Sequence, residues 1–323
     1  GIVGCGSMGR RRIRHACGWA NASVIVWDIR EDRRAAAMDE FSIQIAESED
    51  AFMQNSLDAM FISVPPSEHE YYIERCLAAD IPFMVEQPIS HRTENLDAIL
   101  DVVRQKNLVT HVSQNHRFSA RIRTIQAILG RGDIGRPRTG LVEIGEWLPD
   151  WPPYEPYTDY YPSKRSMGGG IDAICDLDWM IFLFGRVARS TSLCARKSDL
   201  DIDTDDVAQF ILDFEDGPQL MLHTDMLQRS YHQQVRIVGS EGTLVHNHPN
   251  AHIDIFTVST GAWNKEPFEM PGPAVGNIPG KTWQAYVEPM YQDDSLDFLG
   301  RLSRADSSTE SLEAGIYNLM LTK

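Results

Sequence analysis

The feature that most constrains the fold is a glycine-rich segment near the start of the chain, where Gly4, Gly6 and Gly9 have the spacing GxGxxG. An apolar segment typical of a buried strand precedes it, and a helical pattern over residues 8–17 follows it. In that setting the first glycine permits a tight turn, the second lets backbone approach a pyrophosphate, and the third lets the helix pack on the strand. The segment therefore predicts a dinucleotide site at a helix N-terminus, with Ser7 and Met8 beside the phosphates.

The second expected strand, residues 23–28, ends at Asp28, 19 positions after Gly9 (28 − 9 = 19). A carboxylate at this place accepts hydrogen bonds from an adenosine ribose 2′-OH and repels a 2′-phosphate, which favours NAD over NADP. We expect Ile29 and Arg30 to border the same ribose. The nearby cations are Arg30, Arg33 and Arg34. They could weaken the preference, so NADP stays open as an alternative cofactor.

Residues 1–118 alternate short apolar segments with helical patterns, which predicts a doubly wound parallel sheet of the Rossmann type. The strands are expected at residues 1–4, 23–28, 59–64, 83–85 and 108–112. Ser67, followed three positions later by Glu70, predicts a capping box at the start of a helix that runs to Ala79.

After residue 118 the pattern changes to longer alternating segments, at residues 140–147, 206–214, 219–225 and 233–238. They predict an α/β domain with a largely antiparallel open sheet and helices on one side, and residues 214–218 predict a hairpin turn. We therefore expect a cofactor-binding domain at 1–118 and a substrate-binding and oligomerisation domain at 119–323. The open face of the sheet favours a homodimer or homotetramer.

Composition excludes several functional classes. A net charge of −16 argues against a nucleic-acid partner, and no apolar run is long enough to span a bilayer. The five cysteines form no CxxC pair, which argues against a disulfide framework or a zinc site, and we expect no metal. We therefore expect a cytoplasmic protein with free thiols. The chain begins inside the first expected strand, so we also expect a few native residues before Gly1.

Four further segments, at residues 63–69, 83–90, 114–118 and 235–243, carry the motifs SVPPSEH, FMVEQPIS, QNHRF and VRIVGSEGT. In combination they resemble the Gfo/Idh/MocA family, the glucose–fructose oxidoreductase and inositol dehydrogenase group. The resemblance implies a Rossmann domain, a second α/β domain with an open sheet, and a pyranose-like substrate between the two. The further cofactor contacts that it implies are Val64, Pro65, His69, Glu86, Gln87 and Asn115.

Two positions depart from the family pattern. Gln87 stands where the family has the lysine of Glu-Lys-Pro. Residues 168–170 resemble the family's glycine cluster, and Cys175 stands where the helix after that cluster has a histidine. The resemblance implies that the lysine polarises the reacting oxygen and the histidine moves its proton. Losing an oxygen-stabilising donor costs roughly 10²–10³ in rate, and losing a general acid or base costs roughly 10²–10⁴. The sequence therefore predicts either replacement groups, a different chemistry, or binding alone.

Several residues are candidates for those roles. Asp172 matches the family's catalytic aspartate, although it could instead be a plain helix-start carboxylate. Tyr160 and Lys164 have the spacing Tyr-x-x-x-Lys of short-chain dehydrogenases, but they lie in a proline-rich loop, where coincidence is the better explanation. Lys164 could still reach the cleft from that loop. The expected substrate contacts are Gln87, His116, Arg117, Tyr160, Lys164 and Asp172, with a solvated loop position as the alternative for His116.

The sequence as a whole indicates an NAD(P)-dependent oxidoreductase that moves a hydride between nicotinamide and a carbinol of a sugar, polyol or sugar derivative. Its catalytic residues are expected to be Asp172, Gln87, Cys175 and Lys164. Two alternatives stay open. One is an NAD-using glycosidase of the same family, and the other is a dinucleotide- or sugar-binding protein with weakened turnover.

Overall fold

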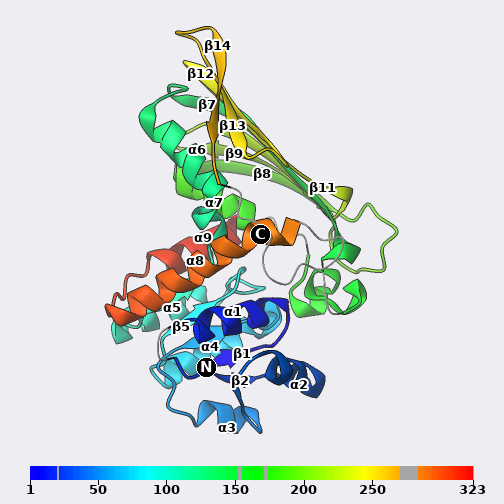
Figure 1. Cartoon of the computed structure of the whole chain (residues 1–323), viewed down its shortest axis with the longest axis vertical. Helices are drawn as coiled ribbons and strands as arrows, with labels where there is room; N and C mark the ends of the chain where they lie inside the picture. The colour runs from blue at the N-terminus through cyan, green and yellow to red at the C-terminus, as the bar shows by residue number, and fades with distance from the viewer. Residues whose placement is uncertain (20–21, 152–154, 171–173, 270–282, 323) are drawn as a thin grey trace.

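The computed structural model describes residues 1–19, 22–151, 155–170, 174–269 and 283–322; the side chains of 174–175 and 283–288 fall outside the description. Figure 1 shows a small sheet surrounded by helices at one end of the molecule and a large, curved sheet at the other. Helices α8 (Trp283–Ser303) and α9 (Glu310–Leu321) lie between them.

The N-terminal sheet has six strands in the order β3-β2-β1-β4-β5-β6, and every strand pair described is parallel. The strands are β1 (Ile2–Val3), β2 (Ile25–Trp27), β3 (Gln44–Ile45), β4 (Met60–Ile62), β5 (Phe83–Val85) and β6 (Thr110–Val112). The helices are α1 (Ser7–Cys17), α2 (Glu31–Glu40), α3 (Glu49–Met53), α4 (His69–Ala78) and α5 (Leu96–Lys106). The strand order reverses between β1 and β4, where ligands bind in such sheets. The predicted Rossmann sheet is confirmed, whereas β3 and α3 went unpredicted because their apolar segments are so short.

The predicted capping box at the start of α4 is wrong. A 3₁₀ turn, η1 (Pro66–Glu68), precedes the helix, so Ser67 lies inside that turn rather than at the helix boundary. Its hydroxyl donates to the Glu68 carboxylate at 3.2 Å. The Glu70 carboxylate points elsewhere and accepts hydrogen bonds from Ser90 and Arg92.

The second sheet has eight strands in the order β14-β13-β12-β11-β7-β10-β9-β8; β7 and β10 are parallel and the other described pairs are antiparallel. The strands are β7 (Pro137–Trp147), β8 (Val187–Ala195), β9 (Val207–Phe214), β10 (Gln219–Asp225), β11 (Leu227–Gly239), β12 (Gly242–Asn247), β13 (His252–Thr257) and β14 (Ala262–Pro267). The prediction of a largely antiparallel sheet is confirmed, and so is the hairpin between β9 and β10.

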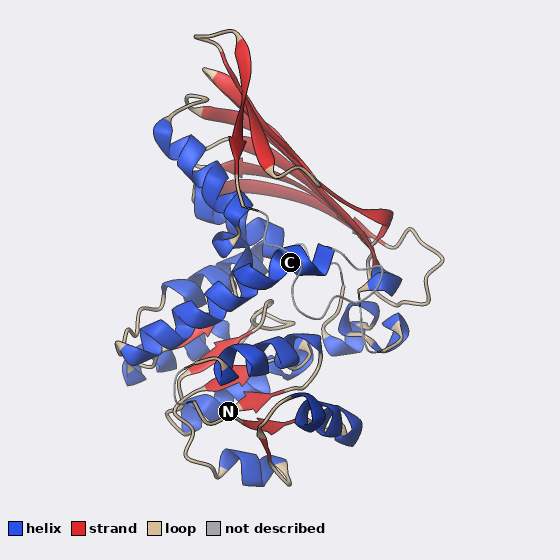
Figure 2. Ribbon diagram, viewed as in Figure 1, coloured by secondary structure: helices blue, strands red, loops and turns tan. Residues whose placement is uncertain are grey.

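Two helices cover one face of this sheet, α6 (Ala120–Arg131) and α7 (Ile174–Phe184) (Figure 2). Ile122 and Ile125 of α6 and Trp179 of α7 belong to the same buried apolar cluster as the sheet residues Phe210 and Leu222. Helix α6 ends at Arg131, because Gly132 takes the left-handed conformation (φ 76°) that closes a helix.

Short 3₁₀ turns form the segment between β7 and α7. They are η3 (Leu148–Asp150), η4 (Tyr157–Asp159), η5 (Tyr161–Ser163) and η6 (Arg165–Met167), and η2 (Asn115–Phe118) joins the two domains.

The C-terminal helices pack on the N-terminal sheet. The Phe298 ring of α8 meets the Phe61 ring edge to face, with centroids 5.4 Å apart, inside a buried cluster that includes Ile13. Ile316 of α9 joins the cluster on the opposite side of the sheet, together with Val112. The C-terminal helices therefore complete the core of the first domain. The domain boundary at residue 118 stays a prediction.

Candidate active site

A cleft lies between the carboxyl ends of the N-terminal strands and the second sheet. From the N-terminal domain it is lined by Gly6, Ser7, Met8, Val64, Pro65, His69, Glu86, Gln87, Asn115 and His116. From the second domain it is lined by Ile144, Glu146, Glu155, Tyr160, Asp176, Thr224, Asp225, Tyr231 and Gln233. Most of the residues expected to bind cofactor therefore share one wall.

The glycine turn is shaped as a dinucleotide requires. Gly4 has φ +90°, and a Cβ there would lie 2.3 Å from the carbonyl oxygen of Ser63. A Cβ on Gly9 would lie 1.8 Å from the carbonyl oxygen of Gly4, so no side chain fits between the turn and α1. Gly6 stands at the N-cap of α1, and no side chain caps that helix. The backbone N–H groups at its start are therefore suited to phosphate, and the residues present fit the diphosphate of NAD.

Asp28 fixes the turn to the end of β2. Its carboxylate accepts hydrogen bonds from the backbone N–H of Cys5 at 2.6 Å and of Arg30 at 2.8 Å. The side chain of Ile29 is 88% exposed, and Arg34 lies over the Trp27 ring at 4.9 Å. Each carboxylate oxygen of Asp28 keeps acceptor capacity, since it can receive more than one hydrogen bond.

A buried ion network lies directly behind the cleft. Both carboxylate oxygens of Glu86 accept hydrogen bonds from the guanidinium of Arg12, at 2.7 and 2.9 Å. The same guanidinium, which is fully buried, reaches Asp294 at 3.1 Å and Ser295 at 2.7 Å, both on α8. Arg12 therefore joins the cleft wall to a helix about 280 positions later in the chain (294 − 12 = 282).

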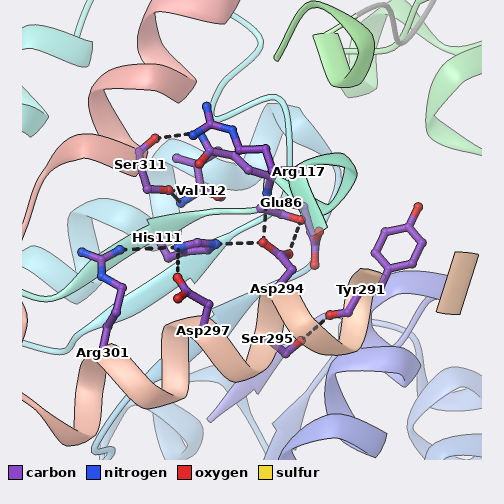
Figure 3. Close-up of polar contacts among 12 residues, drawn as sticks. Glu86, His111, Val112, Arg117, Tyr291, Asp294, Ser295, Asp297, Arg301 and Ser311 are labelled. Carbon is purple, nitrogen blue, oxygen red and sulfur yellow. Dashed lines mark hydrogen bonds and ion pairs between the residues drawn. The ribbon is translucent and has the colours of Figure 1, made fainter. Parts of the chain in front are cut away.

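The network continues away from the cleft. Figure 3 shows the imidazole of His111 between Asp294, at 2.8 Å, and Arg301, at 3.5 Å. Burial alone would raise the pKa of Asp294, but the hydrogen bond from His111 and the charges of His111 and Arg12 lower it to about 2. Asp294 therefore stays ionised beneath the site.

The side-chain amide of Gln87 lies in the lining of the cleft without a hydrogen-bond partner. Its Oε1 and Nε2 are both buried, and neither makes a hydrogen bond. Nδ2 of Asn115, on the same wall, is also buried and makes none. A buried polar group without a partner costs about 1–3 kcal/mol, so such groups in a cleft are typical of sites that a ligand completes.

His116 and Asp176 lie side by side in the lining of the cleft. Nδ1 of His116 is buried, makes no hydrogen bond, and lies 3.5 Å from Oδ1 of Asp176. The same oxygen accepts a hydrogen bond from the Trp179 indole at 2.9 Å, which orients the carboxylate. Sequence reasoning missed Asp176; the available signal was its position directly after Cys175, in the helix for which the resemblance implies a catalytic role.

The other predicted site residues are placed as follows. The Arg117 guanidinium binds both oxygens of Asp178, at 2.8 and 2.7 Å, and lies over the Phe182 ring. The Lys164 ammonium binds Asp159 at 3.1 Å and is not among the residues that line the cleft. Asp172 lies outside the described residues, and of Cys175 only the backbone is described, in the first turn of α7.

His69, one of the expected cofactor contacts, is fully buried. Its two ring nitrogens lie 2.8 Å from the carbonyl oxygens of Pro88 and Val64. Burial lowers the pKa of His69. It therefore ties the segment after β4 to the segment that carries Gln87.

In the part of the chain that the structure describes, no helix has the length and apolarity needed to cross a membrane. Within the same ranges, no three His, Cys, Asp or Glu side chains gather as they would around a metal ion.

Both domains match family models. The oxidoreductase family with an NAD-binding Rossmann fold matches residues 1–114, and the GFO/IDH/MocA C-terminal domain matches residues 122–245. Uncharacterized oxidoreductase YrbE of Bacillus subtilis is 25% identical over 75% of this chain and 72% of its own length. Protein y4oX of Sinorhizobium fredii is 26% identical over 72% of the chain and 65% of its own length, and inositol 2-dehydrogenase of Corynebacterium glutamicum is 28% identical over 42% of each.

Solved structures share the whole fold. An oxidoreductase from Agrobacterium radiobacter, in complex with NAD+, L-tartaric acid and magnesium, covers 99% of this chain and 92% of its own, with a TM-score of 0.83 and 18% identity. A levoglucosan dehydrogenase in complex with NADH and levoglucosan covers 99% and 94%, with a TM-score of 0.80 and 17% identity. The order of the two matched domains confirms the resemblance drawn from sequence: the chain belongs to the Gfo/Idh/MocA family of oxidoreductases.

Proposed function

We propose that the protein is an NAD-dependent dehydrogenase that oxidises a carbinol of a sugar, polyol or sugar derivative, or reduces the corresponding ketone. One observation carries the proposal: the unpaired amide of Gln87 shares a cleft with the glycine turn and with the His116–Asp176 pair. The relatives named for inositol and levoglucosan support this class of substrate. Bound NAD would supply the hydride acceptor.

Gln87 holds the reacting oxygen in this proposal. Its Nε2 donates one hydrogen bond to that oxygen, and its Oε1 accepts from a neighbouring hydroxyl of the substrate. The amide is preorganised, because it is already desolvated and makes no hydrogen bond within the protein. It carries no charge, so it orients the oxygen without the full polarisation that a lysine gives.

His116 takes the proton. As the carbinol carbon is oxidised, the imidazole accepts the hydroxyl proton, and the nearby Asp176 carboxylate stabilises the imidazolium that results. Trp179 keeps that carboxylate in place. The pair thus does the work of the histidine that Cys175 replaces, and Asp172 stays a predicted orienting group.

The test measures binding first and turnover second. Calorimetry of the purified protein with NAD and NADH should show saturable binding. A panel of inositols, levoglucosan, aldoses and UDP-amino sugars should then yield NADH with at least one member. We expect His116→Ala to lower kcat by about 10²–10⁴ and Gln87→Ala to lower it by about 10²–10³, while NAD affinity changes little.

The outcomes separate the alternatives. No binding of either nucleotide would overturn the proposal. Tight NAD binding without NADH formation on any panel member would favour a dinucleotide-binding protein. Cleavage of a glycoside without net NADH would favour the NAD-using glycosidase.

We also propose that a second copy of the chain covers the outer face of the large sheet. Ile211 and Met221 are paired across β9 and β10 on the face opposite the helices, and they are 45% and 46% exposed. Leu193 on β8 is more exposed still. Sedimentation of the wild type should give a dimer or tetramer, which Ile211→Glu with Met221→Glu should dissociate; a monomeric wild type would contradict this.

A further inference from the structure

A carboxylate from the second domain reaches the adenosine end of the cleft. Glu155, in the segment between β7 and α7, binds Arg33 through both oxygens, at 2.8 and 2.6 Å. Its second oxygen also accepts a hydrogen bond from Arg30 at 3.0 Å. The Glu155 side chain is only 13% exposed, whereas the side chains of Arg33 and Arg30 are 27% and 45% exposed.

The two arginines stand where a phosphate on the ribose would need them. Arg30 follows the predicted ribose ligand Asp28 by two residues, and Nη1 of Arg33 lies 4.0 Å from the Asp28 carboxylate. Arg33 also lies against the glycine turn, 3.5 Å from where a Cβ on Gly6 would be. A protein with Arg30 and Arg33 free at this place would have the planar donors that bind a 2′-phosphate.

Neither guanidinium is free in this structure. The rest of Arg30 is held by Asp32, with Nε and Nη2 at 3.1 and 2.6 Å from its carboxylate. Three carboxylates, Asp28, Asp32 and Glu155, therefore lie among three guanidinium groups, because Arg34 also reaches this place and donates to the backbone carbonyl oxygen of Asp28 at 2.5 Å; the local charge is zero (3 − 3 = 0). A phosphate monoester, which carries about −1.5 to −2, would therefore meet guanidinium groups whose charge is already offset by carboxylates.

We propose that Glu155 is a specificity-determining residue for the cofactor, which excludes NADP by occupying the two arginines that would bind its 2′-phosphate. This rests on the proposed function, since it needs a dinucleotide whose ribose lies at Asp28. Asp28 and Glu155 then act together. Asp28 accepts a hydrogen bond from a ribose hydroxyl, and Glu155 keeps Arg30 and Arg33 from binding a 2′-phosphate. The selectivity is set by the second domain as well as by the Rossmann domain.

The experiment measures cofactor binding without any substrate. Calorimetry gives the dissociation constants of NADH and NADPH for the wild type, Glu155→Gln and Glu155→Ala. We expect both variants to bind NADPH about tenfold or more tightly than the wild type does, while the NADH constant changes less than about threefold. Asp159→Asn is the matched control, because it removes the same charge from the same segment, where the carboxylate binds Lys164 instead of the arginines.

Each possible result decides whether Glu155 sets the preference for NAD. An unchanged ratio of the two constants in both Glu155 variants, or a gain in Asp159→Asn equal to theirs, would overturn the inference and leave the proposed function standing. A wild type that prefers NADPH would also overturn the inference, and it would change the cofactor named in the proposed function but not the dehydrogenase chemistry. A wild type that binds neither nucleotide would overturn the proposed function itself, and with it this inference.

Discussion

Replacing Arg12 with methionine should destabilise the protein by about 3–5 kcal/mol. The side chain is fully buried and supplies the cation for Glu86 and Asp294. Methionine fills a similar volume but leaves the fully buried Asp294 carboxylate and the mostly buried Glu86 carboxylate without this cation. Removing one partner of a buried ion pair costs more than the pair itself contributes, because the remaining charge is left without compensation.

A double-mutant cycle isolates the reason. Asp294→Asn removes one of the two stranded charges, so Arg12→Met should cost less in that background than in the wild type, with a coupling of about 1–3 kcal/mol. Urea denaturation followed by circular dichroism gives the free energies of unfolding. Arg14→Met is the control: it lies on the same helix, but its side chain is 46% exposed and pairs with Glu40, so we expect a change within about 1 kcal/mol. If Arg12→Met matched Arg14→Met, or if the cycle were additive, the network would not stabilise the fold as argued.

Three further predictions concern glycines of the helices and one buried histidine. Gly9→Ala should abolish NADH binding in calorimetry, because its Cβ would overlap the Gly4 carbonyl oxygen; a normal dissociation constant would contradict this. Gly315→Ala should destabilise by about 1–3 kcal/mol, since its Cβ would lie 2.8 Å from a methyl of Val112, whereas Gly130→Ala, with open space around it in α6, should stabilise by about 0.5–1 kcal/mol; urea denaturation tests both signs. Burial, and then the charge of Arg121, lower the pKa of His246 from 6.5 to about 3. Between these two pH values the unfolded chain binds a proton at His246 and the folded chain does not. Protonation of His246 therefore leaves the free energy of unfolding unchanged above about pH 6.5. Between about pH 6.5 and pH 3 it lowers that free energy by up to about 1.4 kcal/mol per pH unit. His246→Gln should therefore flatten the fall in unfolding free energy between pH 6.5 and 4, and an unchanged slope would refute it.

Local sequence patterns predicted the parallel sheet and the glycine turn of the first domain. The glycine spacing, the apolar segments and the acid that ends β2 each depend on residues close together in the chain, and the parallel sheet follows from their order. The capping box failed because a proline at residue 66 starts a 3₁₀ turn, which moves Ser67 out of the capping position. Patterns of this kind indicate that a helix exists more securely than they locate its first residue.

What escaped prediction depends on contacts between distant parts of the chain. Arg12 in the first helix and Asp294 in the eighth have no local signal that joins them, and neither position looks buried from its neighbours alone. Glu155 was one acid in an aromatic, proline-rich loop, and only the folded chain brings it to Arg33. Asp176 was passed over because the family pattern directed attention to Cys175 beside it.

The charges around the cleft give a reason why Gln87 stands where the family has a lysine. The carboxylate of Glu86 already has its cation in Arg12, so an ammonium at Gln87 would enter the wall without a ready counter-ion. Near the opposite wall, Arg121 is buried with Nη1 unpaired; burial lowers its pKa, while the neighbouring Tyr231 and Asp176 oppose that shift. Positive potential therefore reaches Asp176 and the adjacent His116 from α6 rather than from the segment after β5. On this argument Gln87→Lys alone should not restore the chemistry of the family, because it adds a second cation to a site whose electrostatics have been rearranged around another one.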